Sequence, residues 1–388
     1  MKVFVVLSRV PYPLDKGDKL RAFNFVRYLS EYHDIYLCCL NENKLHPKAY
    51  KKLKPFCKEI FIIDLPKISI VYNIFKVLFT GKPFQTGYFY STKAKKRIND
   101  IIKSIQPDHI FCQLIRMAEY VKDINIPKTI DYQDAFSFGI KRRMQTEPFY
   151  IKPLLQSEYD RMMRYEYDVF RWFDNKIIIS ETDRNLISHP LYKDIHVLPN
   201  GVDLFYYQPI KVAKEYDIIF TGNMAYPPNI DASQYLVKEI LPLVIKKFPN
   251  VKVLLAGASP HNLVKKLKSE NVEITGWVDD MRDCYSKSKI FIAPMRIGTG
   301  LQNKLLEAMA MQLPCITTLL ANDALKAKNN RDILIGNSPE TLANCICMLL
   351  ENEDKRNEIA MNGYDFVAAN FNWERNVEVL NELITNTI

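Results

Sequence analysis

The sequence predicts an α/β protein in which two doubly wound domains, each built on a parallel sheet, follow one another. Short apolar runs alternate with amphipathic helical segments along most of the 388 residues, which is the pattern of strands buried between helices. At roughly 150 residues per domain, this length corresponds to at least two domains. Because 48% of the residues are hydrophobic and 25% are charged, the composition supplies real cores and excludes disorder, collagen-like repeats and small disulfide scaffolds.

The first half opens with a valine-rich strand at 2–7, followed by a loop rich in proline and glycine. A helix is expected to begin at Asp18, a favourable N-cap residue. Further strands are expected at 35–40, 60–64, 109–112, 129–131 and 176–180.

The second half repeats this alternation. Strands are expected at 216–221, 251–256, 273–275, 290–293 and 315–318, with helices at 230–248, 261–269, 281–286 and 301–311. The segment 199–210 begins Pro-Asn-Gly-Val-Asp and continues as a polar stretch, so it is interpreted as the linker between the domains.

The cysteines and the apolar runs indicate a cytoplasmic protein. The eight cysteines are scattered without metal-ligand spacing, and buried free thiols in a reducing compartment are expected. No apolar run reaches the roughly 18 residues of a membrane-spanning helix. The opening run breaks at Arg9 and Pro11 and is too short for the apolar core of a signal peptide.

Positive charge is concentrated in the first half. Through His196 there are 33 lysines and arginines against 22 acidic residues, whereas from Val197 onward there are 20 against 22. This asymmetry favours an anionic partner for the first half. A solvated, lysine-rich surface explains the same counts.

The segment 292–310 carries the strongest chemical signal. A strand ends near Pro294, Gly298 and Gly300 allow close backbone approach, and a helix follows. A helix N-terminus binds anions through its free N–H groups and its dipole. Arg296 and Lys304 add positive charge, and a carboxylate at Glu307 on the same helical face suits ribose hydroxyls. Such a loop fits a nucleotide sugar, although an ordinary strand-to-helix loop with a surface Lys–Glu pair has the same spacing.

This segment resembles the signature of family 4 of the retaining glycosyltransferases. Glu307-Ala308-Met309-Ala310, followed by Pro314, matches the second half of the family motif, with Gln312 where a glycine usually stands. Further matches follow in the order of the family: 199–203, 220–224, 255–257, 275–280 and 371–374. The segment from Arg9 to Lys19 resembles a branch of bacterial polysaccharide-assembly sugar transferases.

The resemblance implies the GT-B architecture, with two Rossmann-like domains facing a central cleft. Residues 1–198 would form the acceptor-side domain, 211–371 the donor-binding domain, and the helix 372–388 would pack back on the first domain. Catalytic roles fall to Arg296, Lys304 and Asp134. The implied donor-binding residues are Gly17, Gly222, Asn223, Trp277, Val278, Thr299, Gly300, Leu301 and Glu307, and the implied acceptor-side residues are Asp18, Arg21 and Arg116.

Two departures from the family bear on the donor site. The first glutamate of the motif would stand at position 299, where this chain has Thr299. The arginine and lysine that usually follow the turn at Gly222 are also absent, since the segment continues Asn-Met-Ala-Tyr-Pro-Pro-Asn. Arg296 and Lys304 would then supply most of the charge for the diphosphate.

The resemblance implies transfer of a hexosyl group with retention at the anomeric carbon. The acceptor hydroxyl would attack the face that the phosphate leaves, and the phosphate would take its proton. Cations and a helix N-terminus stabilise the charge on that phosphate without a metal. The chain has no convincing DxD motif, and Asp279 and Asp280 are expected to cap the next helix. No metal and no cofactor are predicted beyond a UDP- or GDP-linked sugar as co-substrate.

Asp134 and the two aromatic, basic segments leave alternatives open. Asp134 follows a strand and could orient the acceptor hydroxyl or cap a helix. The segments 68–90 and 136–173, together with the lysines at 93–96, suit peripheral contact with an anionic membrane that presents a lipid-linked acceptor. Packing of the aromatic side chains into the core is the other interpretation. Nucleic acid is not expected as a partner.

The sequence therefore predicts a glycosyltransferase that adds a sugar to a saccharide or lipid-linked precursor of a cell-surface polysaccharide. Its predicted location is the cytoplasm, including the inner face of the cell membrane. Absent paired catalytic carboxylates and an absent cofactor lysine argue against an epimerase or phosphorylase with the same architecture. A non-catalytic relative that acts as a membrane-associated binding subunit is the remaining alternative, because Thr299 replaces the motif carboxylate.

Overall fold

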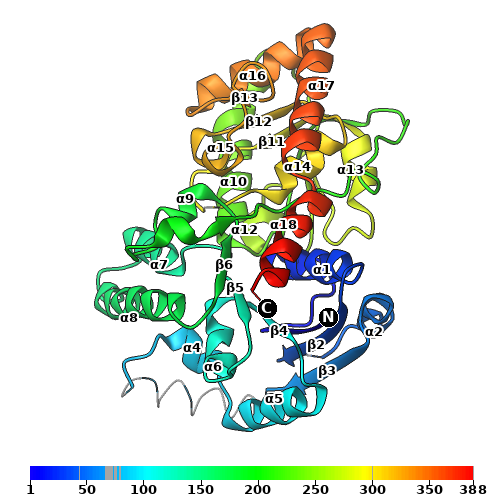
Figure 1. Cartoon of the computed structure of the whole chain (residues 1–388). Helices are drawn as coiled ribbons and strands as arrows, with labels where there is room; N and C mark the ends of the chain where they lie inside the picture. The colour runs from blue at the N-terminus through cyan, green and yellow to red at the C-terminus, as the bar shows by residue number, and fades with distance from the viewer. Residues whose placement is uncertain (43, 66–72, 74–76, 78–79, 299, 388) are drawn as a thin grey trace. The chain divides into compact units, whose positions relative to one another are not determined.

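The computed structural model describes residues 1–42, 44–65, 73, 77, 80–298 and 300–387 (Figure 1). The chain divides into two compact units. Unit 1 comprises Met1–Pro199 with Trp373–Ile388, and unit 2 comprises Asn200–Asn372. The predicted boundaries lie at 198/199 and 371/372.

Unit 1 contains a seven-stranded parallel sheet in the order β3-β2-β1-β4-β5-β6-β7. Its strands are β1 (Lys2–Leu7), β2 (Asp34–Asn41), β3 (Glu59–Asp64), β4 (His109–Gln113), β5 (Lys128–Asp131), β6 (Asn175–Ile178) and β7 (His196–Val197). Its helices include α1 (Gly17–Leu29), α2 (Ala49–Leu53), α4 (Phe84–Phe89), α5 (Thr92–Ile105), α6 (Ala118–Val121), α7 (Phe136–Thr146), α8 (Lys152–Phe170), α9 (Glu181–Arg184) and α18 (Trp373–Thr385).

Strand β1 is buried on both faces, which explains its continuous apolar sequence. Val3, Val5 and Leu7 belong to one core, which also holds side chains of α1 and α18. Phe4 and Val6 belong to the core on the opposite face. The strand order reverses between β1 and β4, and ligands of doubly wound sheets bind at the carboxyl ends of strands near such a point.

Unit 2 contains a six-stranded parallel sheet in the order β10-β9-β8-β11-β12-β13. Its strands are β8 (Tyr216–Thr221), β9 (Val253–Ala256), β10 (Val272–Ile274), β11 (Ser288–Ala293), β12 (Cys315–Thr317) and β13 (Leu334–Ile335). Its helices include α10 (Pro227–Tyr235), α11 (Leu241–Ile245), α12 (Asn262–Lys265), α13 (Met281–Ser286), α14 (Asn303–Ala310), α15 (Leu319–Leu325), α16 (Pro339–Glu351) and α17 (Glu353–Asn370).

The predicted fold class, two parallel doubly wound sheets, is confirmed. Sequence analysis missed β7 and β13, because each has only two residues and gives no periodic signal. The helix expected at 230–248 is divided by a π turn over Leu236–Ile240. Among the described residues, no helix is long and apolar enough to cross a bilayer.

Two predicted caps have different outcomes. Asp280 caps α13, since its side chain accepts a hydrogen bond from the Arg282 N–H. The prediction for Asp18 is wrong, because α1 begins at Gly17 with Lys16 as its N-cap. The carboxylate of Asp18 instead pairs with Arg9 at 2.9 Å.

Arg21 has a structural role, which corrects its assignment to the acceptor side. Its guanidinium and the Asp131 carboxylate are both fully buried and lie 2.7 Å apart. Arg21 Nη1 also donates to the Leu198 carbonyl at 2.8 Å. The pair joins α1 to the carboxyl end of β5, and the arginine has no surface with which to touch a substrate.

We predict that Arg21→Met lowers the free energy of unfolding of unit 1 by about 3–5 kcal/mol, because it leaves Asp131 charged and buried without its partner. Urea unfolding followed by the fluorescence of Trp172 and Trp373, in a Trp277→Phe background, measures the change. The matched control is Lys58→Met, which breaks an exposed pair with Asp34 and costs at most about 1 kcal/mol. Equal losses in the two variants would contradict the prediction.

Candidate functional site

Tight glycine packing shapes the carboxyl ends of β8 and β9 in unit 2. A Cβ atom at Gly257 would lie 1.8 Å from the Gly222 carbonyl oxygen. A Cβ atom at Gly222 would lie 2.6 Å from Asn229 Nδ2 and 3.1 Å from Lys304 Nζ. A side chain at position 222 would therefore displace Asn229 and the amine of Lys304 from the end of β8.

Lys304 lies in the first turn of α14, whose N-terminus has no side-chain cap. Its amine donates a hydrogen bond to Asn229 Oδ1 and lies 4.6 Å from the centre of the Phe220 ring. The side chain keeps some solvent-accessible surface, but the surrounding protein removes most water from the amine. This desolvation lowers the pKa of Lys304 to about 7, although the charge of Glu307 opposes the shift.

Glu307 lies one turn further along α14 and is bound by tyrosines. The Tyr285 hydroxyl lies 2.8 Å from Glu307 Oε2 and 3.0 Å from Thr221 Oγ1. Tyr207 hydrogen-bonds the same carboxyl. Burial raises the pKa of Glu307, and the hydrogen bonds from Tyr285 and Tyr207 work against that rise.

Lys304 and Glu307 thus bind different partners rather than forming the simple surface pair that their spacing allows. Both of the first partners, Asn229 and Tyr285, are uncharged at neutral pH. Neither group is therefore neutralised by an oppositely charged partner, and both are available to a ligand at the start of α14, where backbone N–H groups already attract anions.

Arg296, a predicted catalytic residue, has other partners than Lys304 and Glu307 in this structure. Its guanidinium pairs with Asp231 at 2.8 Å and Glu239 at 3.1 Å, and it stacks on the Tyr235 ring at 4.1 Å. The hydrogen bonds that Arg296 donates to Asp231 are the main cause that raises the pKa of Arg296. Two carboxylates neutralise this arginine in the structure, and its role at a diphosphate stays a prediction.

The other predicted donor residues lie in loops of unit 2. Trp277 is 60% exposed, with its Nε1 donating to Asp279 Oδ1 at 2.9 Å, and Val278 is half-buried. Asn223 forms a turn in which its Oδ1 accepts from the Ala225 N–H at 3.0 Å.

At position 300 the backbone has the positive φ that favours glycine. Gly300 has φ +77° and open space on its Cβ side. Leu301 is half-buried and packs against the core of unit 2. Thr299 lies outside the described residues.

In unit 1, Arg9, Asp18 and Arg116 form a charged cluster. Arg116 Nη2 lies 3.9 Å from the Asp18 carboxylate, and its guanidinium lies 4.4 Å from the Phe89 ring centre. Burial, followed by repulsion from Arg9, lowers the pKa of Arg116 to about 10. Gly17, the first residue of α1, is exposed next to this cluster in sequence.

Asp134 lies in the loop between β5 and α7 with an uncommitted carboxyl. The predicted cap is wrong, because the N-cap of α7 is Ala135. Within the described part of the chain, no hydrogen bond reaches the Asp134 carboxyl. The residue is exposed to solvent, and desolvation by the surrounding protein, followed by repulsion from Asp183 and Asp131, raises the pKa of its carboxyl.

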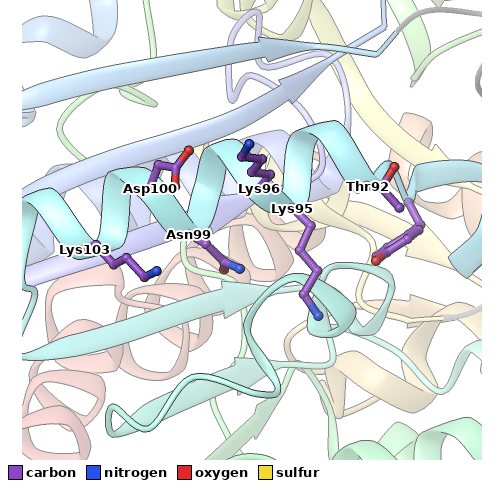
Figure 2. A pocket seen from close by; sticks show the side chains of 7 residues that line it. Thr92, Lys95, Lys96, Asn99, Asp100 and Lys103 are labelled. Carbon is purple, nitrogen blue, oxygen red and sulfur yellow. The ribbon is translucent and has the colours of Figure 1, made fainter.

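A shallow pocket of about 430 Å³ lies along α5. Figure 2 shows that the labelled lining side chains project from this helix, and Tyr90, which precedes the helix, also lines the pocket. Lys95 pairs with Asp123 at 2.6 Å, and Lys96 and Lys103 are exposed. The pocket contains none of the residues predicted for the donor or the acceptor.

The tyrosines and the asparagine around Lys304 and Glu307 were not predicted. Tyr207 is in the predicted linker, Tyr285 is in the last turn of α13, and Asn229 is in the first turn of α10. Nothing in their spacing relates them to α14, since the contacts span 75 residues for Asn229 and 22 for Tyr285. For Asn229, the only sequence signal is its position shortly after the turn at Gly222.

Comparisons with known proteins match unit 2 to one family and the whole chain to one fold. Residues 215–352 match the family described as Glycosyl transferases group 1. An uncharacterized 44.6 kDa protein in the cps region of Klebsiella pneumoniae is 22% identical over 396 residues, covering 95% of this chain and 96% of the relative.

Two solved structures resemble the whole chain. Sucrose-phosphate synthase from Thermosynechococcus elongatus superposes with a TM-score of 0.72 at 15% identity, covering 100% of this chain and 99% of that one. HepE from Anabaena, in complex with UDP and glucose, gives 0.71 at 12% identity, with 98% and 99% covered. These similarities establish the GT-B fold.

We predict that the acetylation rate of the Lys304 amine, measured by peptide mass spectrometry after limiting acetic anhydride, rises with pH to a midpoint at about 7. The reason is that only the unprotonated amine reacts. In Glu307→Gln the midpoint moves lower, because the carboxylate charge raises the pKa of Lys304. A wild-type rate still climbing at pH 9 would show that the amine is well hydrated.

Proposed function

We propose that this protein is a glycosyltransferase that takes a hexosyl group from a nucleotide-diphosphate sugar, because residues 215–352 match the group 1 glycosyl transferases and the chain has the GT-B fold. The acceptor is a saccharide or a lipid-linked saccharide of a cell-surface polysaccharide. The observation that carries the proposal is the desolvated amine of Lys304 beside the tyrosine-bound carboxylate of Glu307 on α14.

The donor fits this arrangement group by group. Its diphosphate binds the N–H groups at the start of α14 and the amine of Lys304. Its ribose hydroxyls donate to the carboxylate of Glu307, which the tyrosines hold in place. Gly222, Asn223, Gly298 and Gly300 border this site, and Trp277 and Val278 bind the base.

Chemistry at the site consists of stabilising a leaving phosphate. The bond between the anomeric carbon and the diphosphate breaks, and the electron pair stays on the phosphate oxygen. Protonated Lys304 and the dipole of α14 stabilise this charge without a metal. The acceptor hydroxyl attacks the face that the phosphate leaves, so configuration is retained, and the phosphate accepts the hydroxyl proton. Asp134 orients that hydroxyl.

The identity of the donor and the acceptor rests on the relatives. HepE binds UDP and glucose, so a UDP-linked sugar is the first donor to test and a GDP-linked sugar the second. The Klebsiella relative is encoded in a cps region, which supports polysaccharide synthesis. We place the protein in the cytoplasm, in contact with the anionic inner face of the membrane where a lipid-linked acceptor is presented.

A second candidate is a non-catalytic binding subunit with the same donor site. The observation that favours it is that Arg296 forms ion pairs with Asp231 and Glu239. Of the two cations predicted to stabilise the leaving phosphate, Arg296 and Lys304, only Lys304 then has no carboxylate partner among the described residues. Binding of a nucleotide without turnover of any nucleotide sugar would identify this case.

The test of the function is thermal unfolding with UDP, GDP, ADP and TDP, with and without EDTA. A nucleotide at about 100 times its Kd stabilises the fold by about 2.7 kcal/mol. We expect one nucleotide to raise the Tm of the wild type in the presence of EDTA and to have no effect on Glu307→Ala. If no nucleotide raises the Tm, the donor-site assignment fails.

We predict that the Kd of UDP rises by up to tenfold per pH unit between pH 7 and 9. Below pH 7 the amine of Lys304 is already protonated, since its pKa in the free protein is about 7. Above pH 7 it must take up a proton to bind the diphosphate, whereas the terminal phosphate of UDP is already ionised. Calorimetry on Lys304→Met is the control, because that variant should bind weakly with a Kd independent of pH.

A further inference from the structure

The turn between α7 and α8 exposes large apolar side chains. Phe149 is 83% exposed, Tyr150 69% and Leu154 54%. The two rings contact each other edge to face, with centroids 5.7 Å apart. Exposed aromatic groups gathered at one place are typical of an interaction site rather than of a free surface.

Basic residues flank these rings in the sequence. Between positions 141 and 152 the chain has four basic residues, Lys141, Arg142, Arg143 and Lys152, and one acidic residue. That acid, Glu147, pairs with Arg143 at 2.8 Å. The turn therefore combines apolar rings with a net positive charge.

The two helices hold the turn in a fixed position. They lie side by side in Figure 1, and Ile140, Leu155 and Met162 pack into the core of unit 1. The buried carboxylate of Glu166 on α8 accepts hydrogen bonds from Ser137 N at 3.0 Å and Ser137 Oγ at 2.6 Å. This carboxylate fastens the start of α7 to the last part of α8, and the turn with the exposed rings joins the other ends of the two helices.

An anionic bilayer is the partner that matches both features. Aromatic and leucine side chains partition into the boundary between headgroups and acyl chains, while lysine and arginine reach the headgroups. Each basic residue near such a surface strengthens binding about fivefold. A second copy of this chain fits less well, because a symmetric contact would bring two positively charged turns together.

We propose that Phe149, Tyr150 and Leu154 insert into the surface of an anionic membrane while Lys141, Arg142 and Lys152 bind its headgroups. The proposal deepens the proposed function, on which it rests for the presence of a lipid-linked acceptor. It names the part of the protein that meets the membrane.

The experiment is sedimentation of the full chain with vesicles of phosphatidylcholine alone or with about a third phosphatidylglycerol. We expect binding to the anionic vesicles and at least tenfold weaker binding for Phe149→Ser/Tyr150→Ser. The matched control is Phe205→Ser, since Phe205 is 89% exposed in unit 2 and should have no effect. Because all three side chains are exposed, these variants should unfold at the temperature of the wild type.

A second pair of variants separates a local site from general attraction to a basic protein. Lys141→Ser/Lys152→Ser and Lys96→Ser/Lys103→Ser each remove two positive charges, the latter from α5 (Figure 2). We expect a loss of at least tenfold for the first and little change for the second. Equal losses would overturn the proposal.

Three other results would also overturn it: unchanged binding of the Phe149→Ser/Tyr150→Ser variant, equal binding to neutral vesicles, or a wild-type dimer that this variant dissociates. The last result would assign the turn to a second copy. The Tm shift with UDP reports the donor site separately. A variant that loses vesicle binding but keeps the Tm shift with UDP supports both proposals. If the wild type shows no Tm shift with UDP but binds anionic vesicles, the proposed donor site fails and the membrane site stands.

Discussion

The donor site depends on one physical constraint: an amine and a carboxylate of α14 are held where little water reaches them, without being paired to each other. Lys304 has a neutral amide as its partner, and Glu307 has neutral phenols. Neither group is neutralised by its partner, so both can interact with a ligand. A bound diphosphate would favour the protonated form of Lys304 and raise the pKa that desolvation has lowered. Arg296 shows the opposite case, because two carboxylates satisfy it.

In unit 1, two aspartates at the end of β5 have different surroundings. Asp131 is fully buried against Arg21 and maintains the fold. Asp134, three residues later, has an uncommitted carboxyl whose raised pKa suits proton transfer near neutral pH. Asp131 is the structural aspartate because its partner Arg21 is buried with it. The sequence does not show this difference, since both positions are aspartates.

The sequence predicts most of the fold and only part of the site. Long apolar strands such as β1 and β8 follow from periodicity, whereas two-residue strands have no signal. Gln312 occupies the usual glycine position of the family motif and adopts φ +53° there, so the backbone shape of the motif is kept at some cost in strain. Tyr285 and Asn229 could not be predicted, because long-range packing alone brings them to α14. The same holds for the carboxylates that neutralise Arg296, since Asp231 is 65 residues away in sequence.

The most direct test of the donor site is a crystal structure of the protein with UDP. We expect the diphosphate within hydrogen-bonding distance of Lys304 Nζ and the first N–H groups of α14, with a ribose hydroxyl on the carboxylate of Glu307. The hydrogen bonds from Tyr285 and Tyr207 should persist. A nucleotide bound elsewhere, or bound at α14 with Glu307 untouched, would contradict the account of how this site holds its donor.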